Sequence, residues 1–366
     1  MTGMTARRRT RARLGHAIAA LATIAALAGC DRTPRLVPPG ADSTTAAIPA
    51  DSTAVYIQMA RDRWDTPDQG DEAARLVARV LLQDLRAHPG ESPAPRARDL
   101  VDSLGMGAEV SGRGPAAVVN LFARANPSGG SWPWLFWRDG GATRGQALEP
   151  GGMHLVGVAV EPPDPAAGPR ASRIAALFSR AGAGGQQPFA FVWQRPPDGA
   201  AWNLAQSLGG DSLGRVGTAR VLQGGPEGTV LESRTYTIAR GFDECASCAH
   251  VYVMRRFRWG TPGLVSASAD IERTPYYSFI QLIQALVAGD PDGAQRWAAD
   301  GSVVSAAEGY EWGRSRGMWR LAPGNAPSAR DLVMFRASQE AYRVHFATRG
   351  DEWVVTGFEP TSRSVE

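Results

Sequence analysis

The stretches LFARA, residues 121–125, and LFSRA, residues 177–181, are near-copies of each other placed 56 residues apart. Trp137 and Trp193 are separated by the same interval. In each copy an apolar run is followed by a Gly-rich turn and by an aromatic run that ends in Trp. Apolar runs bounded by turn residues are typical of antiparallel strands. The middle of the chain is therefore predicted to be β-rich.

The similarity between the two copies continues beyond the tryptophans. Gln146-Ala147-Leu148 corresponds to Gln206-Ser207-Leu208 at an interval of 60 residues, which adds a polar strand to each copy. Two such β-meanders packed together bury an apolar surface that neither could bury alone. The sequence therefore predicts a two-copy internal repeat.

The region before the repeat, residues 54–105, is predicted to be helical. Apolar residues recur there at a period near 3.6, as on the buried face of a helix: Ala73, Leu76, Val77, Val80, Leu81 and Leu85. Pro89-Gly90 ends this pattern, and a shorter helix then ends at Gly105. We expect a pair of core-facing helices; a helix that binds a partner is the alternative.

Downstream of the repeat, three further apolar runs are predicted to be strands: Thr229–Arg240, His250–Trp259 and Leu264–Ile271. The first two flank a pair of cysteines, Cys245 and Cys248. We interpret this pair as a small disulfide that closes a turn between two strands. A redox-active pair and a zinc site that also uses His250 are the alternatives.

The C-terminal segment changes character again. Thr274-Pro275 predicts a helix start and Gly289 its end, and Asp290-Pro291 predicts the cap of a second helix that carries Ala294, Trp297 and Ala298. Strands are then predicted at about 317–321, 331–337, 341–348 and 352–359. This order of helices and then a curved antiparallel sheet resembles the cone-shaped α+β fold of the nuclear-transport-factor-like superfamily, whose domains place ligand or acid/base residues in the cavity of the cone.

The N-terminus carries a different kind of signal. Five arginines precede an eleven-residue apolar run, Ala17–Leu27, which is too short to span a membrane but typical of a signal peptide. The run ends in Leu27-Ala28-Gly29-Cys30, which resembles the bacterial lipobox. The resemblance implies that Cys30 receives a lipid on its thiol and becomes the N-terminal residue after cleavage. An ordinary signal peptide with an incidental Cys is the alternative.

Cleavage before Cys30 changes the charge and the cysteine count of the chain. The mature chain would have 337 residues, with 34 basic against 36 acidic residues, so the formal net charge changes from +3 to −2. A nucleic-acid partner is therefore not expected. With Cys30 lipidated, Cys245 and Cys248 are the two cysteines that remain, and an even number fits a disulfide outside the cytoplasm.

The predicted fold class is α+β, with a helical N-terminal part, a β-rich antiparallel middle that contains the repeat, and a small C-terminal domain of helices and a curved sheet. The predicted divisions are a signal peptide at 1–29, a flexible tether at 30–53, the helical pair plus β-rich domain at 54–273, and the cone-like domain at 274–366.

Two groups of residues are candidates for a ligand surface. Trp132 and Trp134 belong to the run SWPWLFW, residues 131–137, whose flat rings could stack on a sugar. Because aromatic residues alternate onto both faces of this strand, burial in a core is the favoured alternative. Arg343 and His345 share one face of a predicted strand that could line the cone, although a solvent-facing or core histidine is the simpler reading of His345.

These features predict a lipid-anchored, extracytoplasmic binding or structural protein of the bacterial cell envelope that performs no turnover. Its expected partners are membrane lipid through Cys30 and an envelope glycan or protein, with inner and outer membrane left open. The alternative is a hydrolase-like envelope enzyme with its site in the C-terminal cone or at the seam of the β-rich region. The sequence assigns no catalytic residue, no metal ligand and no cofactor.

Overall fold

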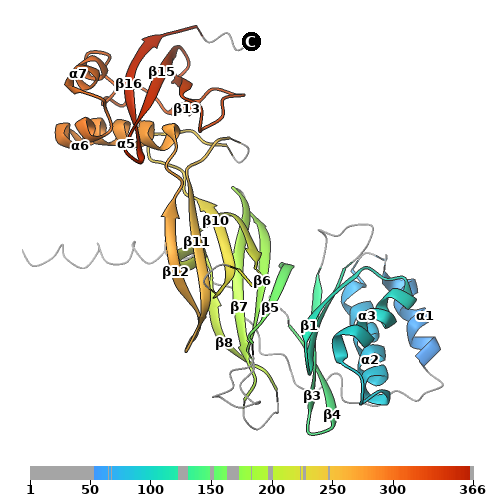
Figure 1. Ribbon diagram of the computed structural model, residues 1–366. Coiled ribbons are helices and arrows are strands. Elements are labelled where there is room, and N and C mark those ends of the chain that lie inside the picture. The colour runs from blue at the N-terminus through green and yellow to red at the C-terminus, as the bar shows by residue number, and fades with distance from the viewer. Residues whose placement is uncertain are drawn as a thin grey trace, which may run out of the picture. The chain divides into compact units, whose positions relative to one another are not determined.

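The computed structural model describes residues 53–362, with gaps at 65, 67, 123–130, 149–151, 163–172, 183, 197–200, 223, 226–227 and 246–247. The described part is α+β: N-terminal helices, four antiparallel sheets of four strands each, and further helices before the last sheet (Figure 1). The predicted class is confirmed at this level. Cys30 and the predicted tether up to residue 52 lie outside the described residues, and Thr53, its last predicted residue, begins the first helix instead. No described helix is long and apolar enough to cross a membrane.

Three helices open the described chain: α1 (Thr53–Trp64), α2 (Gly70–Ala87) and α3 (Pro93–Leu104). The apolar stripe that the 3.6-residue period predicted is the buried face of α2. Pro93 stands in the first turn of α3. Backbone N–H groups of the first turn have no acceptor within the helix, so proline, which lacks an N–H, costs no hydrogen bond there. Gly105 ends α3 in the left-handed conformation, at φ +67°, which glycine adopts without strain.

The first sheet is a meander of β1 (Ala108–Arg113), β2 (Ala116–Leu121), β3 (Trp132–Asp139) and β4 (Ala142–Ala147). One face of this sheet, with Val119, Leu121, Trp134 and Phe136, joins the buried side chains of α1–α3 in a single apolar cluster. Residues on the opposite face of β2 and β3, such as Leu135 and Trp137, are also buried. The alternation of aromatic residues in β3 predicted this burial on both faces.

The second sheet repeats the meander with β5 (His154–Val160), β6 (Arg173–Gly182), β7 (Gly185–Gln194) and β8 (Asn203–Leu208), and the one-turn helix α4 (Gly210–Leu213) follows. The third sheet contains β9 (Val216–Val221), β10 (Thr229–Tyr236), β11 (Tyr252–Gly260) and β12 (Gly263–Ile271), again in meander order. Apolar residues of β5–β8, several of them alanines, form one buried cluster with Leu231, Phe257 and Leu264 of β10–β12, so these two sheets pack face to face.

Two predicted strand boundaries were wrong. β10 ends at Tyr236 rather than at Arg240, and β11 begins at Tyr252 rather than at His250. The segment between them leaves the sheet because it packs with the C-terminal part of the chain. Phe242 is fully buried in the C-terminal core, and the Asp243 amide donates to the carbonyl of Trp319 at 2.8 Å.

The C-terminal part consists of α5 (Pro275–Ala288), α6 (Pro291–Arg296), α7 (Gly301–Gly309), β13 (Trp319–Leu321), β14 (Asp331–Arg336), β15 (Glu340–Arg349) and β16 (Glu352–Pro360). The caps that the sequence predicted are present: the Thr274 hydroxyl accepts from the Tyr277 amide, Asp290 accepts from the Gly293 amide, and Gly289 is left-handed. The sequence missed α7. Trp297 follows α6 as its cap residue rather than lying within it.

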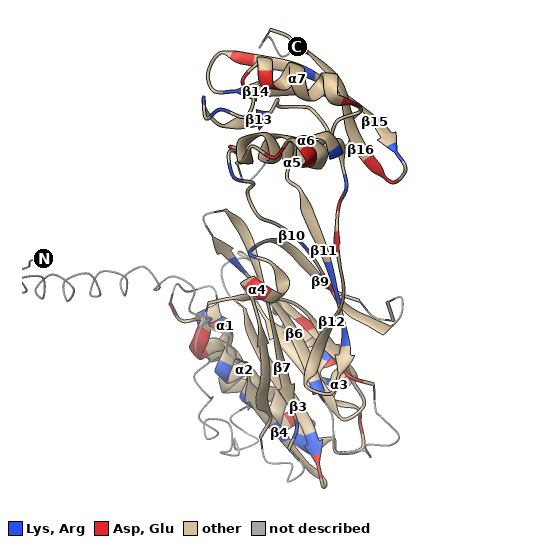
Figure 2. Ribbon diagram, turned by 90° about the vertical axis from the view of Figure 1, so that its left-hand side faces the viewer, with Lys and Arg blue, Asp and Glu red and all other residues tan. Residues whose placement is uncertain are grey.

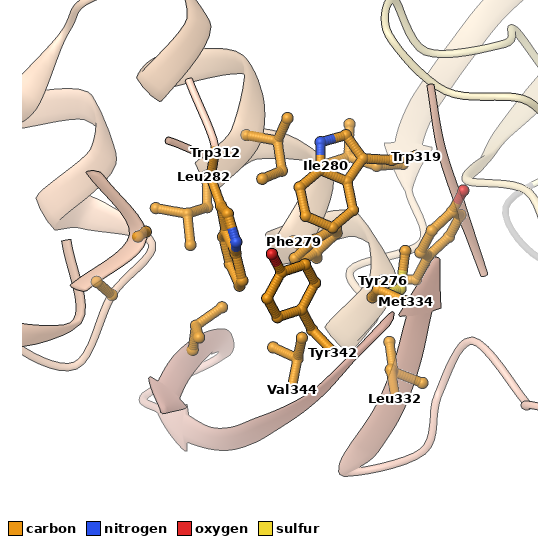
Figure 3. Packing of buried hydrophobic residues seen from close by; sticks show 14 of the residues in the cluster. Tyr276, Phe279, Ile280, Leu282, Trp312, Trp319, Leu332, Met334, Tyr342 and Val344 are labelled. Atoms are coloured by element: carbon orange, nitrogen blue, oxygen red, sulfur yellow. The ribbon is translucent and has the colours of Figure 1, made fainter. Parts of the chain in front are cut away.

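The core of this C-terminal part is rich in aromatic side chains. Phe279 from α5, Trp312 from the segment after α7, Trp319 from β13 and Tyr342 from β15 converge on one another (Figure 3). Trp312 is fully buried, and its ring centroid lies 4.0 to 5.6 Å from those of Phe358, Trp319, Tyr342 and Phe279. The residues between the helices and the sheet therefore fill that space with large side chains.

Candidate functional site

The most unusual polar group in the described chain is a buried cluster of Glu244, His250 and Tyr276. His250 Nδ1 lies 3.0 Å from Glu244 Oε2, and the Tyr276 hydroxyl donates to Glu244 Oε1 at 2.7 Å. The side chains of Glu244 and His250 are 2% and 1% exposed, and Tyr276 is fully buried. Buried polar groups are costly unless they are paired, so these contacts fix the three side chains together.

Protonation within the cluster follows from its geometry. Burial, together with the neighbouring Glu244, raises the pKa of Tyr276 far above its ordinary value, so the phenol stays protonated and remains a donor. Glu244 accepts from this hydroxyl through one carboxylate oxygen, and its other oxygen lies within hydrogen-bond distance of His250 Nδ1. His250 Nε2 is then buried without a hydrogen-bond partner among the described residues.

Aromatic rings complete the environment of His250. The Tyr236 ring stacks on the imidazole with centroids 3.5 Å apart and planes 8° from parallel. Tyr252 meets both rings edge-on, and the Arg234 guanidinium lies 3.4 Å from the Tyr252 ring centroid. Tyr236 ends β10 and Tyr252 begins β11, so the cluster lies where the two strands give way to the intervening segment.

The disulfide lies within the same segment. Cys245 and Cys248 are bonded, with Cα atoms 5.0 Å apart, as the cysteine count predicted. Cys245 is exposed, whereas Glu244 next to it is buried. Among the described residues no group of three or more His, Cys, Asp or Glu is placed to hold a metal ion, and His250 is bound to Glu244 rather than to the sulfur atoms.

The predicted aromatic candidates lie between helices and sheet. Trp134 is 5% exposed and belongs to the cluster with α1–α3. Trp132 is half-buried, its Nε1 donates to Asp71 at 2.5 Å, and its ring centroid lies 5.5 Å from that of Trp64. The helices thus occupy the side of β3 that a sugar would have to approach.

The predicted candidates Arg343 and His345 lie on β15 with the opposite orientation to its buried residues. Tyr342, Val344 and Phe346 face the aromatic core, and Arg343 and His345 face away from it. His345 Nδ1 lies 2.7 Å from Asp331 Oδ1, and Arg343 Nε lies 3.9 Å from Glu359 Oε1. The structure therefore does not place these two residues together with Trp132 and Trp134 in one site.

Sequence reasoning missed a buried arginine that organises the C-terminal part. Arg336 is 0% exposed and donates to the carbonyl oxygens of Tyr310, Glu311 and Arg314. Its guanidinium also lies 5.3 Å from the Trp319 ring centroid. These bonds hold the segment that carries Trp312. No sequence signal marked Arg336, because every basic residue of the chain is Arg.

A second charged group lies on the third sheet, where β11 carries several arginines (Figure 2). Glu232 is 7% exposed and accepts hydrogen bonds from Arg220 at 2.7 Å and from Arg256 at 3.1 Å. Burial of Glu232 acts to raise its pKa, but the hydrogen bonds and charges of the two arginines outweigh burial and hold the pKa below its ordinary value.

Comparison with known proteins gives no match for this chain among protein-family models, curated proteins or solved structures. The geometry described above is therefore the basis for the functional argument.

Proposed function

We propose that this chain is a lipid-anchored, extracytoplasmic binding or structural protein of the bacterial cell envelope, and that it holds a partner without turning it over. The anchor is Cys30, at the end of the lipobox-like Leu27–Cys30. The formal charge of −2 that remains after cleavage disfavours nucleic acid. Membrane lipid through Cys30 and an envelope glycan or protein are the proposed partners.

One observation carries the binding role: Asp331, Arg343, His345 and Glu359 form an open polar surface on β14–β16, which we call the C-terminal polar face. Their side chains are between 39% and 63% exposed. Gly357 of β16 lies opposite His345 in the sheet. A side-chain carbon added at Gly357 would meet no other atom within 4 Å, so the surface beside His345 is open. An open face with both signs of charge is suited to a polar partner surface rather than to an enclosed substrate.

Two finer interpretations of the fold accompany this proposal. We infer that β1–β4 and β5–β8 are two copies of one unit, since Trp137 and Trp193 both lie in the third strand of their meanders. We also infer that α5–α7 and β13–β16 form a cone-like domain whose interior Trp312 fills. Both interpretations are consistent with a rigid body that presents surfaces.

The anchor is tested by Cys30→Ser in the native host. The variant is expected in the soluble fraction and the parent chain in the membrane fraction. A variant that stayed with the membrane would remove the anchor from the proposal.

The binding surface is tested by sedimentation with purified peptidoglycan. The parent chain is expected to sediment, and the double variant Arg343→Ala/His345→Ala is expected to bind on the order of tenfold more weakly, as loss of about 1.4 kcal/mol would give. Arg220→Ala removes an exposed arginine from a different sheet, 70% exposed against 49% for Arg343, and is the control. If the parent chain does not sediment, the glycan is not the partner. If the double variant binds as tightly as Arg220→Ala, the C-terminal polar face is not the binding surface.

The second candidate function is a hydrolase-like envelope enzyme, and the hydrogen-bonded, accessible His345–Asp331 pair favours it. If this pair acted as a general base, the chain would release reducing ends or new termini from peptidoglycan. Asp331→Asn would then abolish the release. Under our proposal neither the parent chain nor the variant releases product.

A further inference from the structure

An exposed disulfide adjoins the buried Glu244–His250–Tyr276 cluster. Cys245 directly follows Glu244, and Cys248 stands two residues before His250. Cys245 is exposed and Cys248 half-buried, whereas both residues of the His–Glu pair are almost fully buried. Cys245 therefore lies at the surface, where a thiol in solution can reach it, whereas the polar cluster is enclosed.

Several contacts of its described residues hold the segment from Glu244 to Val251. The Cys248 amide donates to the Cys245 carbonyl at 2.9 Å, inside the ring that the disulfide closes. The disulfide, the side chains of Glu244 and His250, and partial packing of Ala249 and Val251 against the C-terminal core also hold it. The disulfide thus fixes the distance between the two residues that pair.

We propose that Cys245 is a thiol-exchange site for dithiols, and that reduction of the disulfide releases Glu244 from Tyr276 on α5. A thiolate of the dithiol attacks Cys245 Sγ, the bond between the cysteine sulfurs breaks, and Cys248 leaves as a thiolate. The second thiol of the reagent then attacks the mixed disulfide and frees Cys245. The protein gains two electrons and two protons, and the dithiol becomes a disulfide.

The consequence of reduction follows from the contacts. Without the cross-link the chain from Glu244 to His250 gains conformational freedom, and the carboxylate is no longer held between imidazole and phenol. Because Tyr276 lies in the first turn of α5, this release loosens the start of that helix. β6 and β7 contribute none of these contacts and are expected to remain unchanged.

The test is native-state hydrogen exchange on the full mature chain, oxidised or treated with dithiothreitol, with alkylation and mass spectrometry to count free thiols. We expect both thiols to become alkylated under native conditions and exchange at 244–251 and in the first turn of α5 to accelerate on the order of tenfold. Exchange in β6 and β7 should not change. Cys245→Ser/Cys248→Ser should reproduce the reduced pattern without reductant.

Two variants separate release of Tyr276 from general loosening of the segment. In Tyr276→Phe the hydroxyl is already absent, so reduction should accelerate exchange in α5 less than it does in the parent chain. Tyr277→Phe, which changes the neighbouring half-buried tyrosine, is the matched control and should respond like the parent. The proposal is overturned if the disulfide resists dithiothreitol until the chain unfolds. It is also overturned if reduction accelerates hydrogen exchange in α5 as much in Tyr276→Phe as in the parent chain.

Discussion

The meanders β1–β4 and β5–β8 have the same strand order but are covered by different structures. At the 56-residue interval, Val119, Leu121, Trp134 and Phe136 correspond to Ala175, Leu177, Ala190 and Val192. The first set packs with α1–α3, and the second packs with residues of β10–β12. Three of the four matched positions thus carry a larger side chain under helices and a smaller one under a sheet, and the fourth is Leu in both meanders.

The matched positions keep their face even though the strand register differs. Val119 pairs with Trp134, whereas Ala175 pairs with Val192 rather than with Ala190. A shift of two residues preserves the face to which each side chain points, and a shift of one would not. The two meanders thus share the alternation of buried positions, whereas side-chain size differs with the covering layer.

The largest expected effect tests that adjustment directly. Phe136→Ala removes a fully buried ring from the helix-covered cluster and is expected to lower the free energy of unfolding by about 3–5 kcal/mol. Val192→Ala, at the matched position, removes two carbons and should cost about 2 kcal/mol. Urea denaturation measures both. Equal losses would mean that the two covering layers do not differ as the packing indicates.

A smaller effect tests what the two meanders have in common. Gln146 bonds to the amide and carbonyl of Trp202, both at 3.0 Å, and Gln206 bonds in the same way to Leu264, at 2.7 and 2.9 Å. Gln146→Ala and Gln206→Ala should each leave two backbone groups unpaired and cost about 1–3 kcal/mol. Gln339→Ala, at an exposed turn, is the control. A loss in one variant alone would break the equivalence of the two glutamines.

The buried Glu232 makes the stability of the sheet that covers β5–β8 depend on pH. The pKa of Glu232 is depressed, so its ion pairs stabilise the fold above about pH 4.3, and this contribution is lost as pH falls through the lower folded-state pKa. Glu232→Gln should cost about 1 kcal/mol at pH 7, because Arg220 and Arg256 are largely solvent-screened. The variant should also lose part of the acid sensitivity. Parallel acid profiles for parent and variant, from urea unfolding at pH 3 to 7, would contradict this.

The smallest expected effect lies at the edge of the helix-covered meander. Trp132→Phe removes the hydrogen bond to Asp71 but keeps an aromatic ring against Trp64, and should cost about 0.5–1 kcal/mol. Thermal unfolding measures this loss. Unchanged stability combined with lost binding to peptidoglycan would return Trp132 to the role of a ligand residue.

Local signals predicted much of the fold. The period of α2 and the cap residues Thr274 and Gly289 each act within a few residues, so they can be read from the chain directly. The sequence missed α7, whose nine residues have no strong apolar period. It also extended β10 to Arg240, because apolar alternation cannot reveal that a strand leaves its sheet to pack elsewhere.

The candidate site was predicted only in part. Cys245, Cys248 and His250 were singled out together because they are close in the sequence, but the histidine pairs with Glu244 and, through it, with Tyr276. Tyr276 is 32 residues from Glu244, and nothing in its local pattern distinguishes it from other core-facing residues of α5. Its polar role depends on a contact between distant segments.

The sequence by itself determined the α+β class, the antiparallel strands of the middle region, the burial of both faces of β3 and the pairing of Cys245 with Cys248. These are properties of periodicity, turn chemistry and composition, which act locally along the chain. Only the tertiary structure decided which layer covers each meander, that Arg343 and His345 face away from the aromatic core, and that Glu244 lies between His250 and Tyr276. Such outcomes depend on which distant surfaces meet, because burial and pairing of polar groups are settled by packing and not by neighbours in sequence.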